Sequence, residues 1–281
     1  MKTIEELKDI ATQIRRDVLR MINGAKSGHP GGALGTADFF TYMYNGFMNI
    51  NPSYSSIDGA GEDMFFLSNG HLSSVWYSTL ARRGYIDIKE LSSFRKLNSR
   101  LQGHPTNIDG LPCIRVASGS LGQGLSVAIG AALGKKLSGD KNIVYCLMGD
   151  GELQEGQIWE AMMYAGSKKV DNLVGIVDWN NKQIDGSVEN VMDLGDLRGK
   201  CVSFGWDVLE MNGNNFNDII LNMNIAKGKL GKGKPVMVLM HTVMGFGVDF
   251  MENDHRWHGT PLNDEQLKRA LLQLPETLGD Y

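Results

Sequence analysis

IVYCLMGDG (143–151) and LVGIVDWNN (173–181) are two apolar runs, each followed by glycine and polar residues. We predict strands at 143–149 and 173–178 and a helix at 156–168 between them. These lengths fit a βαβ crossover, which takes about 30 residues in all. Strands that are apolar at consecutive positions are typical of a parallel sheet with helices on both faces. The pattern therefore predicts an α/β fold.

The rest of the chain repeats this alternation of helices and strands. Apolar residues recur at helical spacing from Ile4 to Met21, so a helix is expected over 4–22, ending near Asn23. Other helices are expected at 33–46 (aromatics on one face), 72–82, 88–97, 121–137 (well buried), 217–228 and 263–272, other strands at 64–68, 206–211 and 236–240, and loops at 27–32 and 98–119. Residues 1–281 are thus expected to form a single doubly wound domain, with a mostly parallel sheet and helices on both faces.

Composition excludes several classes of protein. The net charge is −4 over 281 residues and no basic stripe is present, so we expect no nucleic-acid partner. The N-terminal residues lack the apolar core of a secretory signal, and no apolar run is long enough to span a membrane. The three cysteines, Cys113, Cys146 and Cys201, are widely spaced and are expected to be free thiols. These features together predict a cytoplasmic protein.

Asp150 and Asn180 each follow the carboxyl end of a predicted strand. If the two strands are neighbours, these side chains meet at the sheet edge where open α/β sheets bind ligands. A carboxylate, an amide oxygen and a nearby backbone carbonyl are suitable Mg²⁺ ligands when phosphates complete the octahedron. The predicted helix beginning near Glu155 would add the positive end of its dipole. GDG alone could be an ordinary turn, but its spacing from the second strand end favours a ligand site.

Four of the six histidines lie in loops marked by glycine or proline. They are His29, His71, His104 and His258. A single loop histidine is usually only a solvated side chain. Four such loops on one α/β chain favour a site, because histidine can donate to phosphate and hydroxyl oxygens and transfer protons near neutral pH.

Seven segments resemble, in order, the N-terminal domain of the transketolase family. They are SGHPGG (27–32), FLSNGH (66–71), FRKLNSRLQGHP (94–105), SGSLGQG (118–124), GDGELQEG (149–156), DWNNKQIDG (178–186) and WHG (257–259). The resemblance covers nearly the whole chain. It implies the diphosphate-binding domain of a thiamine-diphosphate enzyme.

The resemblance implies thiamine diphosphate as the cofactor, with Mg²⁺ (or Ca²⁺ or Mn²⁺ in its place) between the protein and the diphosphate. The side chains of Asp150 and Asn180 and the backbone carbonyl of Lys182 would bind the metal. The residues that would contact the cofactor are His71, Gly119, Leu121, Gly151, Asn180 and His258.

The resemblance also implies catalytic roles for three residues. His29 and His104 would contact the hydroxyl groups of the donor ketose. Glu155 matches a glutamate whose carboxylate makes a contact across the subunit interface, although a glutamate at a helix start is also favoured by the dipole alone. This chain has Ser120 where larger members of the family often have proline, which leaves the rigidity of that loop open.

In transketolase, the glutamate that contacts the aminopyrimidine ring lies in a second domain, and no segment after His258 resembles that domain. The resemblance therefore implies the N-terminal subunit of a split transketolase, with a separate chain carrying the pyrimidine-binding and C-terminal domains. Two copies of each chain are expected, since closed two-fold assemblies are usual. The implied reaction transfers a two-carbon ketol unit from a ketose (phosphate) to an aldose acceptor, without a membrane or nucleic acid.

Other functions are also compatible with parts of the sequence. The α-subunit of a 2-oxo-acid dehydrogenase likewise carries GDG, but it is not expected to combine SGHPGG with QGHP. A 1-deoxyxylulose-5-phosphate synthase is closer, but it is normally one long chain. A non-catalytic paralogue would be expected to have lost ligands, whereas Asp150, Asn180 and the four loop histidines are present.

Overall fold

The computed structural model describes residues 2–51 and 57–281, which are built around a parallel sheet. The sheet has five strands in the order β1-β2-β3-β7-β6, and every pairing between them is parallel. Their bounds are Met64–Leu67 (β1), Val144–Gly149 (β2), Leu173–Trp179 (β3), Asp207–Asn212 (β6) and Val236–His241 (β7). The predicted strands and their parallel arrangement are confirmed.

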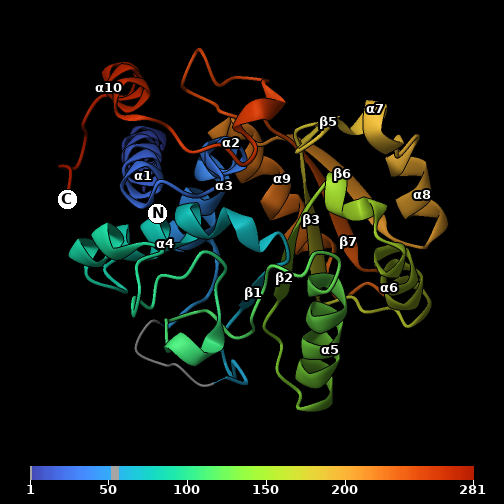
Figure 1. Cartoon of the computed structure of the whole chain (residues 1–281). Helices are drawn as coiled ribbons and strands as arrows, with labels where there is room; N and C mark the ends of the chain where they lie inside the picture. The colour runs from blue at the N-terminus through green and yellow to red at the C-terminus, as the bar shows by residue number, and fades with distance from the viewer. Residues whose placement is uncertain (1, 52–56) are drawn as a thin grey trace.

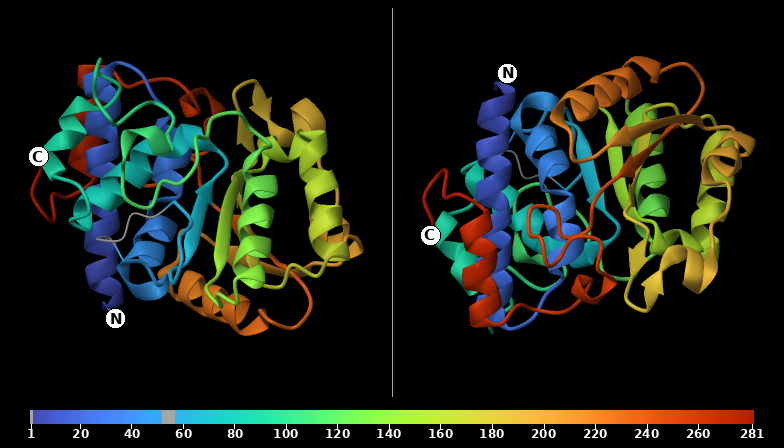
Figure 2. Two further views of the ribbon diagram at one scale, coloured as in Figure 1. Left: turned by 90° about the horizontal axis from the view of Figure 1, so that it is seen from below. Right: turned by 90° about the horizontal axis from the view of Figure 1, so that it is seen from above.

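Helices cover both faces of the sheet, which confirms the doubly wound fold class (Figure 1, Figure 2). On one face, α3 (Ala37–Tyr42), α4 (Ser73–Arg82) and α9 (Phe216–Lys229) share a core with the sheet, and α1 (Ile4–Ala25) packs against α3 and α4. The other face packs against α5 (Gly124–Leu137), α6 (Gly156–Ser167) and α8 (Leu197–Ser203). Side chains alternate between the two layers along each strand, so Tyr145 and Leu147 enter the first core whereas Cys146 and Met148 enter the second.

The unit β2–α6–β3 carries the two strand ends that were predicted to meet. β2 and β3 are neighbours, and Gly149 lies opposite Asp178 in their register. Asp150 and Asn180 therefore leave the sheet at the same edge. This is the edge at which open α/β sheets bind ligands.

Two predicted helices differ from the structure. Residues 33–46 form three pieces instead of one helix: α2 (Pro30–Gly35), α3, and a π-helical segment, η1 (Met43–Phe47). The break lies at Thr36, whose ψ of 0° leaves the α region. Since α2 begins at Pro30, the predicted loop at 27–32 is also shorter than expected; proline is well suited to a first helical position.

The predicted helix at 88–97 is a 3-10 helix, η3 (Ile88–Ser93). It stops there because Phe94 takes a ψ of 127° and Arg95 a left-handed φ of 58°, neither of which an α-helix can accommodate. Four shorter 3-10 segments were not predicted: η2 (Gly70–Leu72), η4 (Asn107–Asp109), η5 (Gly151–Gln154) and η6 (His255–Trp257). Residues 98–119 otherwise form loops, as expected.

The helix expected at 121–137 is present from Gly124, but it is buried on one side only. Val127 and Leu137 are 37% and 90% exposed, so the prediction of a well-buried helix was wrong. Its alanine- and glycine-rich composition did not distinguish a helix covering a sheet from one enclosed on all sides. The segments not predicted in the following region are β4 (Lys182–Gln183), β5 (Gly186–Ser187), α7 (Val188–Met192) and α8.

The remaining local predictions agree with the structure. The last helix, α10 (Asp264–Gln273), begins after Asn263, which forms a capping box with Gln266. All three cysteines are buried free thiols. Within the described part of the chain, none of the helices has both the length and the apolar character needed to span a membrane.

Candidate functional site

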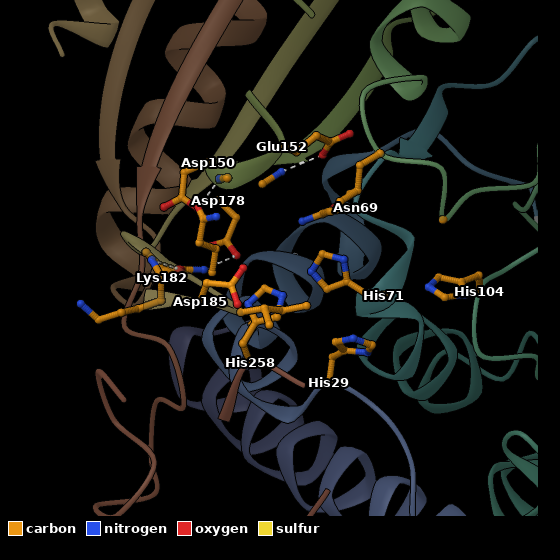
Figure 3. A pocket seen from close by; sticks show the side chains of 18 residues that line it. His29, Asn69, His71, His104, Asp150, Glu152, Asp178, Lys182, Asp185 and His258 are labelled. Atoms are coloured by element: carbon orange, nitrogen blue, oxygen red, sulfur yellow. Dashed lines mark hydrogen bonds between the residues drawn. The ribbon is translucent and has the colours of Figure 1, made fainter. Parts of the chain in front are cut away.

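A cavity of about 370 Å³ lies at the carboxyl ends of β1, β2 and β3 (Figure 3). All ten residues predicted to bind cofactor, metal or sugar line it: His29, His71, His104, Gly119, Leu121, Asp150, Gly151, Asn180, Lys182 and His258. They come from segments far apart in the sequence, and the fold brings them to one edge of the sheet. Glu155 does not line the cavity.

Asp150 is a buried carboxylate that is only 2% exposed. It receives hydrogen bonds from the backbone amides of Gly151, at 2.7 Å, and Asn181, at 2.5 Å. Burial and the neighbouring carboxylate of Asp178 nevertheless raise its pKa to about 7. Because this carboxylate lies beside another acid, a bound cation would stabilise its charged form. The environment thus fits a metal ligand.

Asn180 is oriented by two residues that the sequence analysis missed. Its Nδ2 donates to Asp178 at 3.0 Å, and the Thr242 hydroxyl donates to the other oxygen of the same carboxylate. Asp178 is 2% exposed, and burial raises its pKa to about 6. With Nδ2 held in this way, Oδ1 is the amide atom left to serve as an oxygen ligand. It also accepts from the backbone amide of Lys182 at 2.9 Å. Asp178 and Thr242 therefore orient a predicted metal ligand, although neither was itself predicted to bind the metal.

The end of the cavity that carries the predicted metal ligands, here called the metal end, is completed by the hairpin β4–β5. Lys182 begins β4, beside Gln183, and a side chain at Gly151 would come within 3.3 Å of Gln183. The described residues contain no group of three or more His, Cys, Asp or Glu side chains able to hold a metal by themselves. A carboxylate, an amide oxygen and a backbone carbonyl are a partial donor set. Such a set fits Mg²⁺, whose coordination is usually completed by phosphate and water oxygens.

Three histidine rings gather at the other end of the cavity (Figure 3). Ring centroids are separated by 5.1 Å for His29 and His71, 5.1 Å for His71 and His258, and 5.8 Å for His29 and His258. The Nδ1 atoms of His29 and His258 are buried and have no hydrogen-bond partner among the described residues. Buried polar nitrogens normally have partners, so these atoms are available to a ligand.

The four loop histidines are all more easily deprotonated than a free imidazole. Burial and the nearby His258 lower the pKa of His29 to about 4. Burial likewise lowers the pKa values of His71, His104 and His258. Near pH 7 these rings are therefore neutral, and each presents one donor and one acceptor nitrogen.

His104 lies on the more open side of the cavity, against Gly119. A Cβ atom at Gly119 would come within 2.8 Å of the His104 ring, and φ at Gly119 is +118°. Only glycine is compatible with both the contact and this backbone conformation. The SGSLGQG loop thus places its backbone next to a predicted sugar-binding histidine.

Glu155 lies outside the cavity, at the position preceding the first turn of α6. It is exposed and its side chain makes no capping hydrogen bond. No capping hydrogen bond therefore supports the alternative that Glu155 serves only to stabilise the start of α6. An exposed carboxylate beside the cavity leaves the predicted contact with another subunit sterically available.

Two further buried polar residues of the cavity were missed. Asn69 is 1% exposed, and its Oδ1 has no partner among the described residues. Glu152 is 3% exposed and binds three protein donors. Both residues lie within quoted motifs, Asn69 in FLSNGH (66–71) and Glu152 in GDGELQEG (149–156). They were missed because a polar side chain that becomes buried on folding leaves no repeating pattern in the sequence.

Residues 7–275 match the family model described as the transketolase thiamine diphosphate binding domain. This match covers nearly the whole chain. The chain therefore belongs to the transketolase family, and the cavity lies in its thiamine-diphosphate-binding domain.

Curated relatives include transketolase subunits that are separate chains. Over 275 residues the chain is 37% identical to a subunit of the apulose-4-phosphate transketolase of Phocaeicola vulgatus, covering 98% of this chain and 96% of that one. It is 34% identical to a 6-deoxy-6-sulfo-D-fructose transketolase subunit of Clostridium sp., covering 96% of each. Human transketolase is 33% identical over 96% of this chain, which spans 42% of the human protein.

Solved transketolase structures share the fold. The transketolase of Campylobacter jejuni superimposes with a TM-score of 0.89 at 33% identity, over 97% of this chain and 43% of that chain. The transketolase of Leishmania mexicana superimposes with a TM-score of 0.88 at 30% identity, over 98% of this chain and 41% of that chain. The chain thus spans about two fifths of these transketolases and nearly all of the separate subunits.

Proposed function

We propose that this chain is the N-terminal subunit of a split transketolase. The enzyme transfers a two-carbon ketol unit from a ketose, or ketose phosphate, to an aldose acceptor, using thiamine diphosphate and Mg²⁺. The observation that supports this most strongly is the pairing of two features in one cavity. Asp150 and Asn180 lie at one end, and the three histidine rings lie at the other.

Asp150, Asn180 and the carbonyl of Lys182 would hold the metal, and His71, Gly119, Leu121, Gly151 and His258 would contact the cofactor. When bound, thiamine diphosphate supplies a nucleophilic carbon and an electron sink for cleavage of the bond next to a ketose carbonyl. His29 and His104 would bind the sugar hydroxyl groups. As neutral imidazoles they can take a proton from a hydroxyl and return it.

The proposed enzyme needs a second chain. The names of the relatives and the nearly complete overlap with separate subunits support this proposal. The partner would carry the pyrimidine-binding and C-terminal domains, and we expect two copies of each chain. Glu155, exposed next to the cavity, would contribute its carboxylate to a contact across the interface.

The relatives suggest where to look for substrates. The names of two of them specify apulose 4-phosphate and 6-deoxy-6-sulfo-D-fructose. Both names describe sugars with an anionic group. Sugar phosphates and sulfosugars are therefore the donors to test first, alongside common ketose phosphates.

The direct test is reconstitution. The chain is mixed with the product of a neighbouring reading frame that resembles the remaining transketolase domains, together with Mg²⁺, thiamine diphosphate, a ketose phosphate and an aldose. We expect a sugar lengthened by two carbons, formed only when both chains are present. Absence of two-carbon transfer with every sugar pair from the classes above would overturn the proposal.

The competing functions give different products when pyruvate is added to the same mixture. A 2-oxo-acid dehydrogenase subunit or a 1-deoxyxylulose-5-phosphate synthase would release CO₂ from pyruvate, which transketolase would not. A non-catalytic paralogue would retain the cofactor without converting either substrate. Measuring CO₂ and sugar products together separates the three.

A further inference from the structure

Glu152 is a buried carboxylate in the wall of the cavity, two residues after Asp150. Diphosphate is an anion, and like charges repel strongly where water is excluded. A direct contact between Glu152 and the diphosphate would therefore be unfavourable. The position of this side chain requires another explanation.

The carboxylate of Glu152 is already bound by three protein donors. The Ser68 hydroxyl and the Gly122 amide donate to Oε1, the latter at 2.8 Å. The Gly149 amide donates to Oε2 at 3.0 Å. Buried carboxylates are stable when such donors satisfy their oxygens. Glu152 thus binds protein groups on both of its oxygens.

The three donors belong to three different segments, and each segment contributes to the cavity. Ser68 precedes Asn69 and His71, Gly122 follows Gly119 and Leu121, and Gly149 precedes Asp150. One side chain therefore connects the strand end that carries the predicted metal ligand with both neighbouring loops.

Further contacts close the same junction. The Gly124 amide donates to the Ser68 hydroxyl at 3.0 Å, and Gln157 donates to the Gly122 carbonyl at 2.7 Å. A Cβ atom at Gly124 would lie 2.4 Å from Ser68, and one at Gly70 would lie 2.5 Å from Ser118. The backbones of these loops are therefore in close contact with the segments that Glu152 binds.

We propose that Glu152 is a positioning residue that fixes the backbone of the Asn69–His71 and Gly119–Leu121 segments relative to Asp150 for diphosphate binding. The inference rests on the proposed function, because it assigns the cavity to thiamine diphosphate. Glu152 itself contacts neither the cofactor nor the reacting atoms. It acts through the hydrogen bonds that its carboxylate accepts from Ser68, Gly122 and Gly149.

Calorimetric titration of thiamine diphosphate with Mg²⁺ into the full chain, alone and mixed with its proposed partner, tests this inference. Glu152→Gln keeps the size of the side chain but places an NH₂ group against an N–H or hydroxyl donor. We expect its Kd to rise about 10- to 100-fold, the range typical of lost outer-shell partners. Ser68→Ala removes one donor and should have a smaller effect. Glu265→Gln, an exposed position on α10, is the matched control and should not change the Kd.

Two additional measurements separate positioning from a general loss of structure. Hydrogen exchange should accelerate at the amides of Gly122 and Gly149 in Glu152→Gln, but not in α1. At saturating cofactor, kcat of the two-chain enzyme should return to the wild-type value, because only cofactor binding is weakened. A lower kcat that saturation does not restore would show a structural role alone and overturn the inference.

The remaining outcomes also decide the question. If the wild-type chain binds the cofactor and Glu152→Gln binds it equally well, the positioning role is wrong and the proposed function stands. If the wild-type chain binds no thiamine diphosphate in either mixture, both proposals fail.

Discussion

The two ends of the cavity are built in different ways. At the metal end, Asp150 and Asn180 lie on adjacent strand ends and their side chains already receive hydrogen bonds from nearby amides. At the histidine end, the rings come from three distant loops, and two nitrogens have no partner among the described residues. The metal end is therefore preorganised by the fold, whereas the histidine end keeps unpaired groups for a ligand.

The proposed roles predict that substitutions of the metal ligands and of the sugar-binding histidines, His29 and His104, affect different quantities. Changes at the metal end should weaken cofactor binding. Changes at the sugar-binding histidines should slow the reaction while the cofactor remains bound.

The largest effect is expected for Asp150→Ala, which removes a charged metal ligand. Loss of an outer-shell partner typically costs 10- to 100-fold in metal affinity, so loss of a ligand should cost more than about 100-fold. Calorimetry with Mg²⁺ and thiamine diphosphate measures this change. Asp185→Asn, at the rim of the same cavity, is a control for charge alone. Retention of cofactor by Asp150→Ala would contradict the metal assignment.

The next effect concerns His29 and His104. Replacing either by Gln should lower kcat/KM of the two-chain enzyme by about 100-fold or more, the low end of what positioned acid–base groups contribute. The Kd for thiamine diphosphate should stay unchanged. His241→Gln, a half-exposed position outside the cavity, is the matched control. A loss of cofactor affinity as large as the loss of kcat/KM would remove the distinction between the two ends.

A smaller effect is expected from the support of Asn180. Thr242→Val removes the hydroxyl that donates to Asp178 with little change of shape. Cofactor affinity should fall about tenfold, the lower bound for outer-shell partners. Thr242→Ser keeps the donor and should restore the affinity. Equal affinities for Val and Ser would show that Asp178 does not need this bond to orient the amide.

The smallest effect is a pH dependence of stability at the histidine end. The pKa of His29 is lowered in the folded state to about 4 from an ordinary value of 6.5, so the unfolded chain binds more protons between these values. This residue therefore costs stability as the pH falls from 6.5 towards 4. In His29→Gln that loss is absent, and the free energy of unfolding should decline less between pH 7 and pH 5.5, by about 1 kcal/mol. The free energy of unfolding is measured by urea denaturation at each pH. If it falls equally in the wild type and in His29→Gln, His29 does not titrate as described.

The metal end could be predicted largely from the sequence. Long apolar runs gave both strands, and parallel neighbours place Asp150 and Asn180 at one edge. The number of glycine- and proline-marked histidine loops favoured a site, but the role of each histidine was expected only from the resemblance to transketolase. No local pattern indicates that loops around residues 29, 71 and 258 adjoin, because their contacts depend on the whole fold.

The supporting residues could not be predicted. Thr242 lies 64 positions from Asp178, and Glu152 acts through burial and three donors in separate segments. The neighbouring residues in the sequence do not distinguish a polar side chain in such a buried network from one in a surface turn. The breaks at Thr36 and Arg95 were missed for a related reason, since non-glycine residues rarely signal an unusual backbone conformation.

The most direct test of the account is the position of the metal. Crystals of the full chain grown with thiamine diphosphate and Mn²⁺ would give an anomalous signal for the ion. We predict one peak about 2.1 Å from an Asp150 carboxylate oxygen, Asn180 Oδ1 and the Lys182 carbonyl, as expected for a small divalent cation. A peak among His29, His71 and His258, with none at Asp150, would contradict the assignment of the two ends.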